Sequence, residues 1–454
     1  MFAINFNPNK IVKKLIKYGT LLLLLILIYV AFTNYPRLNI IAGYSAKNMN
    51  SSVFLAQRDV EFTDNTDNNF SPVNFAEDRV DMNEKSSTAT VYGLLTRKAI
   101  FREGIGSVLL LEDEDKNKIN LIPKRGKGPI NMPFPYGDLD QKDTIFQNVN
   151  YDKLKQALEH AFDSIYLTRS VLVVYKDHII GEKYDNGFTK NSKILGWSMT
   201  KSITATIYGV LQNQGRININ DKAPVASWSN DERQNITISN LLHMNSGLEW
   251  DEDYNSISDV TKMLFLAKDM TKIQEEKKLL GKPDESWNYS SGTTNLLSGI
   301  LRDQFNSHQE YLDFWYTNLI DKIGMYSMLI ETDLSGNYVG SSYGWATPRD
   351  WSKFGLLYLK RGNWNGEQIF DESWVDYVTT PTQGSDGQYG GHFWLNAGGV
   401  YPDAPKDLFS ANGYQGQRVF VIPSLELVIV RMGLTEEPIF DFNNFLTGII
   451  TSIN

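Results

Sequence analysis

An uncharged apolar run near the amino terminus divides this 454-residue chain into a membrane-directed segment and a globular remainder. The run extends from Tyr18 to Phe32 and follows a group of lysines at positions 10, 13, 14 and 17. Its 15 residues are few for a helix that spans a membrane, which needs about 17 to 25, but Leu15 and Ile16 lengthen it if the lysine side chains reach the interface. We therefore predict a transmembrane anchor or signal sequence at residues 18–34.

The lysines also predict how this segment is oriented. Basic flanks stay on the cytoplasmic side of a membrane, so residues 1–17 are expected to form a cytoplasmic basic segment and residues after about 35 to face the outside or the periplasm. Cleavage of a signal sequence requires small residues at the first and third positions before the cut, and the stretch from Tyr29 to Thr33 offers no clean pair. A single-pass anchor in the cell membrane is therefore favoured over an exported, cleaved form.

Composition excludes several classes of function for the rest of the chain. There is no cysteine, so disulfides, thiolate nucleophiles and thiolate-bound metals are ruled out. The five histidines are spaced unlike any set of metal ligands, and we expect neither a metal nor a cofactor. A net charge of -9, without a basic patch after the first 20 residues, argues against a nucleic-acid partner. Covalent catalysis would have to use Ser, Thr, Lys, Asp, Tyr or His.

The chain after the apolar run falls into two parts. Residues 35–149 form an amino-terminal extension of uncertain fold, in which the polar stretch from Asn48 to Ser87 predicts a surface linker or meander. Alternating apolar residues at Ala89–Leu94 and Ser107–Leu111 predict short strands within the extension. Residues 150–454 carry the patterns of a folded domain.

Hydrophobic patterns at both ends of that domain predict one sheet. Apolar residues four positions apart indicate a helix from Tyr151 to Asp163, and two hairpins are expected at residues 171–184 and 418–432. A last helix is expected from Phe440 to Ile453, and the middle of the domain has a helical pattern. This order indicates an α/β fold whose sheet is built from both ends of the domain, with the helical middle inserted between them.

Ser198 is the only serine in the chain with a lysine, Lys201, three positions later. Apolar residues with helical spacing follow it, so Ser198 is expected to open a buried helix with Lys201 on the same face one turn later; they are Ile203, Ile207, Val210 and Leu211. A serine hydroxyl becomes nucleophilic when a base takes its proton, and burial can lower the pKa of a lysine far enough to make it that base. The alternative is a helix-capping serine beside a solvated lysine.

Two further clusters carry residues suited to the same chemistry. Tyr289, in the stretch Trp287–Gly292, lies between a loop and a helix start and can point into a cleft. Beside an ammonium its phenolate form would be favoured, so it can relay protons. Gly413, in the stretch Ala411–Gln417, allows backbone to approach a ligand, and a strand-edge N–H there can stabilise an oxyanion. Taken alone, a tyrosine such as Tyr289 is more often a packed aromatic, and the stretch with Gly413 is only a turn.

In this order, and together with the stretches Leu241–Leu248 and Pro283–Gly292, the clusters resemble the penicillin-recognising serine hydrolases, specifically the class C β-lactamase-like family that includes esterases and amide hydrolases. The resemblance covers roughly residues 150–454. It implies a β-lactamase-like antiparallel sheet flanked by helices, with an inserted helical subdomain. The expected chain is thus one amino-terminal membrane helix, the extension and a serine hydrolase domain.

The resemblance also implies roles for single residues. Ser198 would be the acylated nucleophile, and Lys201 and Tyr289 would share the acid/base work. The oxyanion would be held by the N–H groups of Ser198 and Ala411, with Gly413 at the substrate-binding turn. The expected activity is acyl-enzyme hydrolysis of a small-molecule ester or amide, and the oligomeric state is left open.

Two departures from the family pattern bear on the substrate. Counting back from Gly413 places Leu408-Phe409-Ser410 where such β-lactamases carry Lys-Thr-Gly, so the cation that grips a substrate carboxylate is missing. Ser291 stands where the family's tyrosine element ends in Asn. Both departures favour esters or amides without that carboxylate, although β-lactam-like or cell-wall-peptide substrates stay open because a nearby side chain could restore the contact: Gln417, Arg418 or Arg431.

Two other functions were considered. Gly340–Gly344 matches the Gly-x-Ser-x-Gly pattern of an α/β-hydrolase, with Ser342 as nucleophile and His392 downstream. That elbow needs a strand before the serine and a helix directly after it, and the sequence around Ser342 predicts neither. A non-catalytic envelope binding module with the same fold is the second alternative, which the joint presence of a serine, a lysine and a tyrosine in family positions disfavours.

Overall fold

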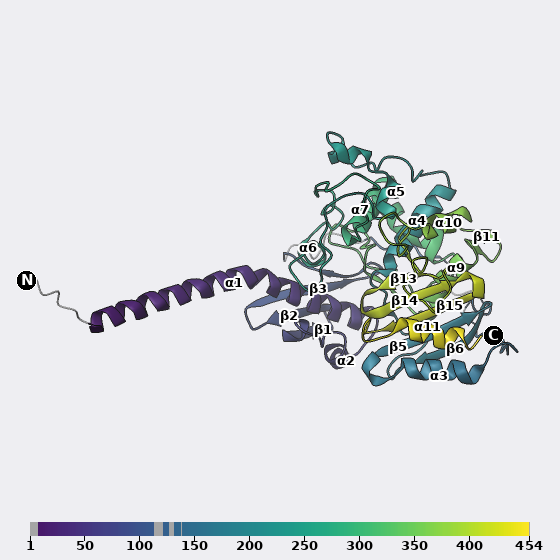
Figure 1. Ribbon diagram of the computed structural model, residues 1–454, viewed down its shortest axis with the longest axis horizontal. Helices are drawn as coiled ribbons and strands as arrows, with labels where there is room; N and C mark the ends of the chain where they lie inside the picture. The colour runs from purple at the N-terminus through teal and green to yellow at the C-terminus, as the bar shows by residue number, and fades with distance from the viewer. Residues whose placement is uncertain (1–7, 113–120, 127–130, 138, 454) are drawn as a thin grey trace, which may run out of the picture.

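The computed structural model describes residues 8–112, 121–126, 131–137 and 139–453, and shows a globular body from which one long helix projects (Figure 1). This helix, α1 (Pro8–Phe54), exposes large apolar side chains from Val12 to Tyr35 and becomes buried in the body from about residue 42. It is long and apolar enough to cross a membrane, and no part of its most apolar stretch is covered by the rest of the protein. Residues 1–7 of the predicted cytoplasmic segment lie outside the described residues.

The body is built on a six-stranded antiparallel sheet with the strand order β12-β13-β14-β15-β5-β6. Strands from the two ends of the domain meet where β15 pairs with β5. The predicted sheet built from both ends is therefore confirmed. Its strands are β5 (Thr168–Tyr175), β6 (His178–Tyr184), β12 (Trp394–Leu395), β13 (Phe409–Gly413), β14 (Gln417–Ile422) and β15 (Leu427–Gly433).

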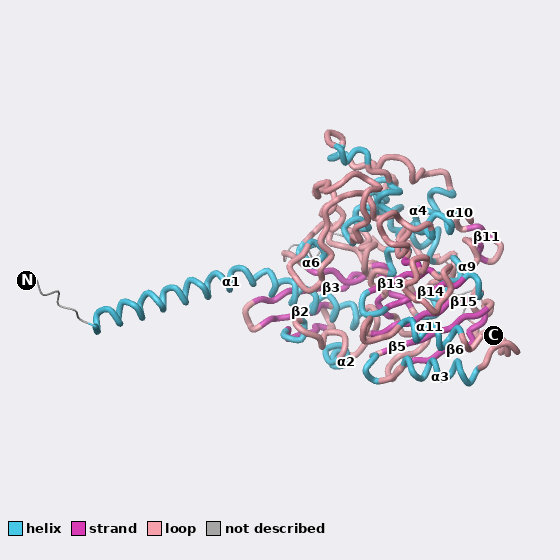
Figure 2. Tube along the Cα trace, in the orientation of Figure 1, coloured by secondary structure: helices cyan, strands magenta, loops and turns pink. Residues whose placement is uncertain are grey.

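Helices cover both faces of this sheet (Figure 2), so its central strands read as continuous apolar runs. Successive side chains of a strand point to opposite faces. In β5, Leu172 and Val174 join the core beneath α4 (Met199–Asn213) and α9 (Pro348–Leu359). Val171 and Val173 join the core beneath the terminal helices of the domain, α3 (Tyr151–Ala161) and α11 (Phe442–Ile450).

The inserted middle is mainly helical, as the resemblance implied, and its helix α7 packs against α4. Its helices are α5 (Ile238–Leu242), α6 (Asp259–Leu266), α7 (Ser291–Asp303), α8 (His308–Trp315) and α10 (Ser373–Thr379). The short strands β7 (Ile194–Leu195), β9 (Gly344–Ala346) and β8 (Leu329–Ile330) form a small sheet in that order, and β10 (Asn363–Trp364) pairs with β11 (Glu367–Gln368).

The amino-terminal extension forms a compact layer around α1 rather than the linker predicted for residues 48–87, and that prediction is wrong. Helix α1 runs on to Phe54, and a four-stranded antiparallel sheet packs on its second half. Several polar side chains of the predicted linker are buried with partners instead: Asn48 donates to Asn68, and Asp67 pairs with Arg58 and Arg169. The other elements are α2 (Val60–Asn65), β1 (Ala76–Asp81), β2 (Ser86–Val91), β3 (Leu95–Arg102) and β4 (Gly106–Leu109).

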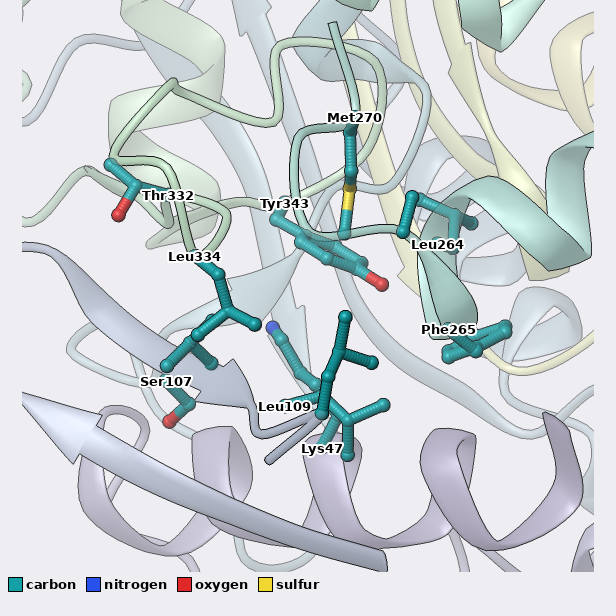
Figure 3. Close-up of a pocket in the computed structure, with 12 residues that line it drawn as sticks. Lys47, Ser107, Leu109, Leu264, Phe265, Met270, Thr332, Leu334 and Tyr343 are labelled. Atoms are coloured by element: carbon teal, nitrogen blue, oxygen red, sulfur yellow. The ribbon is translucent and has the colours of Figure 1, made fainter. Parts of the chain in front are cut away.

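A buried ion pair joins α1 to Glu331, which directly follows β8. Lys47 pairs with Glu331, which also accepts hydrogen bonds from Ser51 Oγ at 2.8 Å and Trp345 Nε1 at 2.9 Å. Figure 3 shows Lys47 reaching from α1 to beneath the ring of Tyr343, whose centroid is 3.8 Å from Nζ. The cavity at this junction measures about 10 Å³, room for about one water molecule, so the junction is a packed contact between two parts of the chain.

Candidate active site

Ser198 lies at the amino terminus of α4, in the turn that leads from β7 into the helix. Its side chain makes no capping hydrogen bond to the helix, so the hydroxyl is available for chemistry. Trp197, just before it, adopts a left-handed φ of 47° and stacks on Tyr44 of α1, with ring centroids 6.0 Å apart. Helix α1 therefore packs directly behind the turn that presents Ser198.

Lys201 is buried, with 1% of its surface exposed, so the alternative of a solvated lysine is wrong. Its Nζ lies 3.0 Å from Ser198 Oγ, 2.9 Å from Ser291 Oγ and 3.0 Å from the carbonyl oxygen of Ser341. Burial lowers the pKa of Lys201 to about 8, partly opposed by the negative charge of Glu252. About a tenth of the amine is consequently neutral at pH 7, one helical turn from the candidate nucleophile.

Tyr289 is the third predicted catalytic residue, and it lies near both Lys201 and Ser198. Its ring centroid is 4.9 Å from Lys201 Nζ, and its side chain lines the same cleft as Ser198. Burial, followed by the charge of Glu252, raises the pKa of Tyr289 well above its ordinary value. The phenol therefore stays protonated, and the expectation that a nearby ammonium would favour its phenolate form is wrong because desolvation outweighs it.

Ser291 and Glu252 were not identified as functional from the sequence. Ser291, the first residue of α7, is fully buried and contacts Lys201 directly. Glu252, in the loop between α5 and α6, accepts hydrogen bonds from the backbone N–H of Ser291 at 2.8 Å and from its hydroxyl. Glu252 lies in no recognisable sequence motif. The only sequence feature that linked Ser291 to the site was its position in the family's tyrosine element.

Ser198 and Tyr289 open into a cleft of about 390 Å³. Gly413, at the end of β13, lines this cleft, and a Cβ there would lie 2.0 Å from the carbonyl oxygen of Gly196, so only glycine lets β13 approach the turn before Ser198 so closely. Ala411 is buried with its side chain in the core and is not among the lining residues, so its oxyanion N–H stays a prediction. The other lining residues are mostly aromatic or polar: Tyr254, Gln388, Trp394, Leu395, Val400, Tyr401, Ser410, Asn412, Tyr414, Arg418, Glu436 and Glu437.

Of the three side chains suggested to replace the missing cation, only Arg418 lines the cleft. Arg418 donates to the carbonyl oxygens of Gly413 and Gln417, both at 2.9 Å. Arg431 is fully buried and donates to backbone carbonyls and threonines, while the Gln417 side chain bridges backbone groups around Gly433.

Within the described residues, no cluster of three His, Asp or Glu side chains has the arrangement of a metal site.

The rival serine, Ser342, has none of the surroundings of a nucleophile elbow. It is buried, it precedes rather than follows a strand, and its hydroxyl pairs with that of Ser341 at 2.8 Å. His392 is bonded instead to Thr294 and to the carbonyl of Leu242. The glycines of the motif allow close packing on α4, since a Cβ at residue 340 or 344 would lie 2.5 or 2.7 Å from a threonine hydroxyl of that helix.

Comparisons with known proteins agree with this architecture. A protein from Bacillus anthracis assigned as a 6-aminohexanoate-dimer hydrolase matches with a TM-score of 0.54 and 20% identity, over 66% of this chain and 80% of that chain. A family VIII carboxylesterase matches with a TM-score of 0.51 and 15% identity, over 68% and 98%. A D-stereospecific amidohydrolase from Streptomyces sp. also gives 0.51 and 15%, over 66% and 98%. At these identities the likeness shows a shared fold.

The family itself is shown by sequence. Residues 158–444, more than half of the chain, match the family model described as Beta-lactamase. This range includes α4 with Ser198 and Lys201, the loop with Tyr289, and the sheet strands that border the cleft. The chain belongs to the β-lactamase family of serine hydrolases.

Proposed function

We propose that this protein is a membrane-anchored serine hydrolase that cleaves small-molecule esters or amides through an acyl-enzyme intermediate on Ser198. The observation that carries the proposal is the position of a buried Lys201 amine, with its pKa lowered to about 8, at 3.0 Å from Ser198 Oγ. A lysine desolvated in this way can accept a proton from a hydroxyl. The open cleft at Ser198 gives a substrate carbonyl access to that hydroxyl.

In the first half of the proposed reaction, Ser198 Oγ attacks the carbonyl carbon of the substrate while its proton moves to the neutral amine of Lys201. The C–O bond to Ser198 forms, and negative charge collects on the carbonyl oxygen. When this tetrahedral intermediate collapses, the bond to the leaving group breaks, and the alkoxide or amine takes the proton held by the Lys201 ammonium. Tyr289 supports this step as a neutral hydrogen-bond donor, because its phenol stays protonated.

The second half releases the acyl group. A water molecule gives a proton to the neutral Lys201 amine and attacks the ester carbon; the bond from that carbon to Ser198 Oγ then breaks, and Ser198 takes the proton back from Lys201. In both halves the oxyanion needs backbone N–H donors. We propose the N–H of Ser198 at the start of α4, and a second N–H near the end of β13, where Gly413 and Tyr414 line the cleft.

The cleft supports esters or amides over β-lactams. Residues 408–410, which take the place of the family's Lys-Thr-Gly, include no cation. Arg418 is the cation among the residues that line the cleft, but it is bound to two carbonyl oxygens and its charge acts on Glu436, which lines the same cleft. Aromatic side chains at the cleft, such as Tyr254, Trp394 and Tyr414, suit an apolar or aromatic group.

We further propose that α1 is retained as a single-pass anchor and that the hydrolase domain is extracytoplasmic, in the periplasm where a second membrane exists. Two observations support this. The apolar part of α1 is exposed and follows basic residues, and the same helix continues without a break into the packed body. Cleavage before residue 42 would leave the buried half of α1 in place, so exported and anchored forms would share one active site.

A substrate panel tests the proposed function. Full-length protein in detergent is assayed with p-nitrophenyl esters, short p-nitroanilide amides and nitrocefin. We expect kcat/KM for at least one ester or amide to exceed that for nitrocefin about tenfold or more, since a missing charged hydrogen bond to the β-lactam carboxylate costs about 1.5–3 kcal/mol.

Two variants control the panel. Ser198→Ala should abolish turnover, and Ser342→Ala, which changes the rival serine, should leave turnover at the wild-type level. Turnover that survives Ser198→Ala, or the lack of any turnover by a folded protein, would refute the proposal.

A further inference from the structure

We propose that Glu252 is the positioning residue that fixes the direction of the hydrogen bonds around Lys201, acting through the hydroxyl of Ser291. The inference deepens the proposed function and rests on Lys201 being the base for Ser198. It assigns a task to a carboxylate that no sequence pattern singled out. It also explains why Ser291 stands in the tyrosine element.

Glu252 is surrounded by hydrogen-bond donors. Its two oxygens accept from the indole N–H of Trp250, from the hydroxyl of Tyr254 at 3.2 Å, and from the backbone N–H of Ser291 at 2.8 Å. The fourth donor is the hydroxyl of Ser291. An ionised carboxylate only accepts, so this ring of donors suits Glu252 in its charged form.

The carboxylate decides where the single proton of the Ser291 hydroxyl points. Because Glu252 can only accept, the Ser291 proton is directed toward it, away from Lys201. The lone pairs of Ser291 Oγ are then left to accept from Lys201 Nζ at 2.9 Å. Ser291 is fully buried, so the other protein groups around it, rather than bulk water, set this direction.

The direction matters because a neutral lysine has two N–H donors and one lone pair. Ser341 presents a carbonyl oxygen, which can only accept, and Ser291 is made to accept by Glu252. Both N–H groups are thereby used. Ser198 Oγ, at 3.0 Å, is the one of the three contacts that can donate its proton to the amine, so the lone pair faces the nucleophile.

The same contacts serve the protonated state. After Ser198 gives up its proton, the ammonium has three N–H groups, and Ser198, Ser291 and Ser341 provide one acceptor each. The proton can be stored there and returned to the leaving group with no rearrangement of Ser291. Without the carboxylate, the Ser291 hydroxyl would be free to donate to the amine and occupy the lone pair needed by Ser198.

Charge gives a second, separable effect. The groups that titrate or carry charge around Lys201 are Glu252, Tyr289 and His392. Tyr289 stays neutral because burial raises its pKa, and burial lowers the pKa of His392 to about 3, so it is also neutral at pH 7. Glu252 is therefore the charge that acts on Lys201, and it raises the pKa of the amine.

The test is the pH dependence of labelling by a fluorophosphonate probe in full-length protein, wild type against Glu252→Gln. In the wild type the second-order rate should rise through about pH 8 as Lys201 loses its proton. In Glu252→Gln the amide can donate to Ser291 and reverse its hydroxyl, so we expect the plateau rate to fall about 10- to 100-fold. The rise itself should move to lower pH, because the charge that raised the pKa of Lys201 is gone.

A double-mutant cycle with Ser291→Ala separates positioning from general damage. Without the Ser291 hydroxyl there is nothing to reverse, so Glu252→Gln should cost less than about threefold in that background. Asp253→Asn is the matched control, since it removes a neighbouring carboxylate that is exposed and bonded within its own loop. Its rate and pH profile should equal those of the wild type.

Three outcomes would overturn the inference. They are an unchanged Glu252→Gln profile, a lower plateau without any shift in pH, and an equal loss in the presence and absence of the Ser291 hydroxyl. Each of these leaves Ser198 labelled in the wild type and thus spares the proposed function. Failure of the wild type to be labelled at Ser198 would remove the proposed function and this inference with it.

Discussion

Replacing Lys201 by alanine is expected to lower the rate of acylation of Ser198 by about two to four orders of magnitude, the usual contribution of a general base. The Lys201 amine is the nearest basic group to Ser198 Oγ, at 3.0 Å, and burial keeps a fraction of it neutral near pH 7. Tyr289 cannot replace it, since its pKa is raised by burial and its phenol holds its proton. The rate is measured as kcat/KM for the best ester of the panel.

A matched lysine controls this experiment. Lys262, on α6, is exposed, and Lys262→Ala should leave kcat/KM within about twofold of the wild type, as for a surface substitution. The folded state of both variants is checked by near-ultraviolet circular dichroism. A loss smaller than tenfold in a folded Lys201→Ala protein would contradict the role given to the amine.

Replacing Lys47 by alanine is expected to lower the free energy of unfolding of the body by about 3–5 kcal/mol, the usual cost of leaving one member of a buried ion pair alone. Glu331, its partner, is fully buried and would keep only neutral donors, among them Ser51, the backbone N–H of Ser107 and Trp345. Because α1 also packs behind Trp197, the loss should loosen the turn that holds Ser198. Unfolding by urea in detergent, followed by tryptophan fluorescence, measures the change.

Two further variants test whether the loss of stability comes from the unpaired buried charge. The double variant Lys47→Met, Glu331→Gln removes both charges and should recover part of the lost stability, since no unpaired charge stays buried. Lys98→Ala breaks a more exposed pair with Glu84 and should change stability by about 1 kcal/mol or less. A Lys47→Ala effect no larger than that of Lys98→Ala would show that α1 is only loosely attached to the body.

The sequence predicted the sheet and the helix of Ser198 because both have strong local patterns. The hairpins at the two ends of the domain are dense in β-branched and apolar residues, and their pairing across β15 and β5 buries these residues in two cores, one on each face of the sheet. Helix α4 has apolar side chains at helical spacing directly after Ser198, and it is buried as expected. Local patterning and tertiary burial agree in these elements.

The extension and half of the site could not be predicted because their signals are not local. The polar residues from position 48 to the end of α1 were predicted to belong to a linker, yet Ser51 is buried because its partner, Glu331, lies far along the chain. The carbonyl of Ser341 contacts Lys201 from within the rejected Gly-x-Ser-x-Gly motif, and a backbone carbonyl leaves no mark in a sequence. Glu252 joins the site only through the fold of its loop.

The central claim is that the Ser198 hydroxyl is the nucleophile of this protein. The most direct measurement is peptide mapping by mass spectrometry after full-length protein has reacted with a fluorophosphonate, whose phosphonyl group stays on the serine as fluoride leaves. We predict one phosphonyl group per chain, on the peptide that contains Ser198. A phosphonyl group on the peptide that contains Ser342, or a folded protein that carries none, would contradict the account.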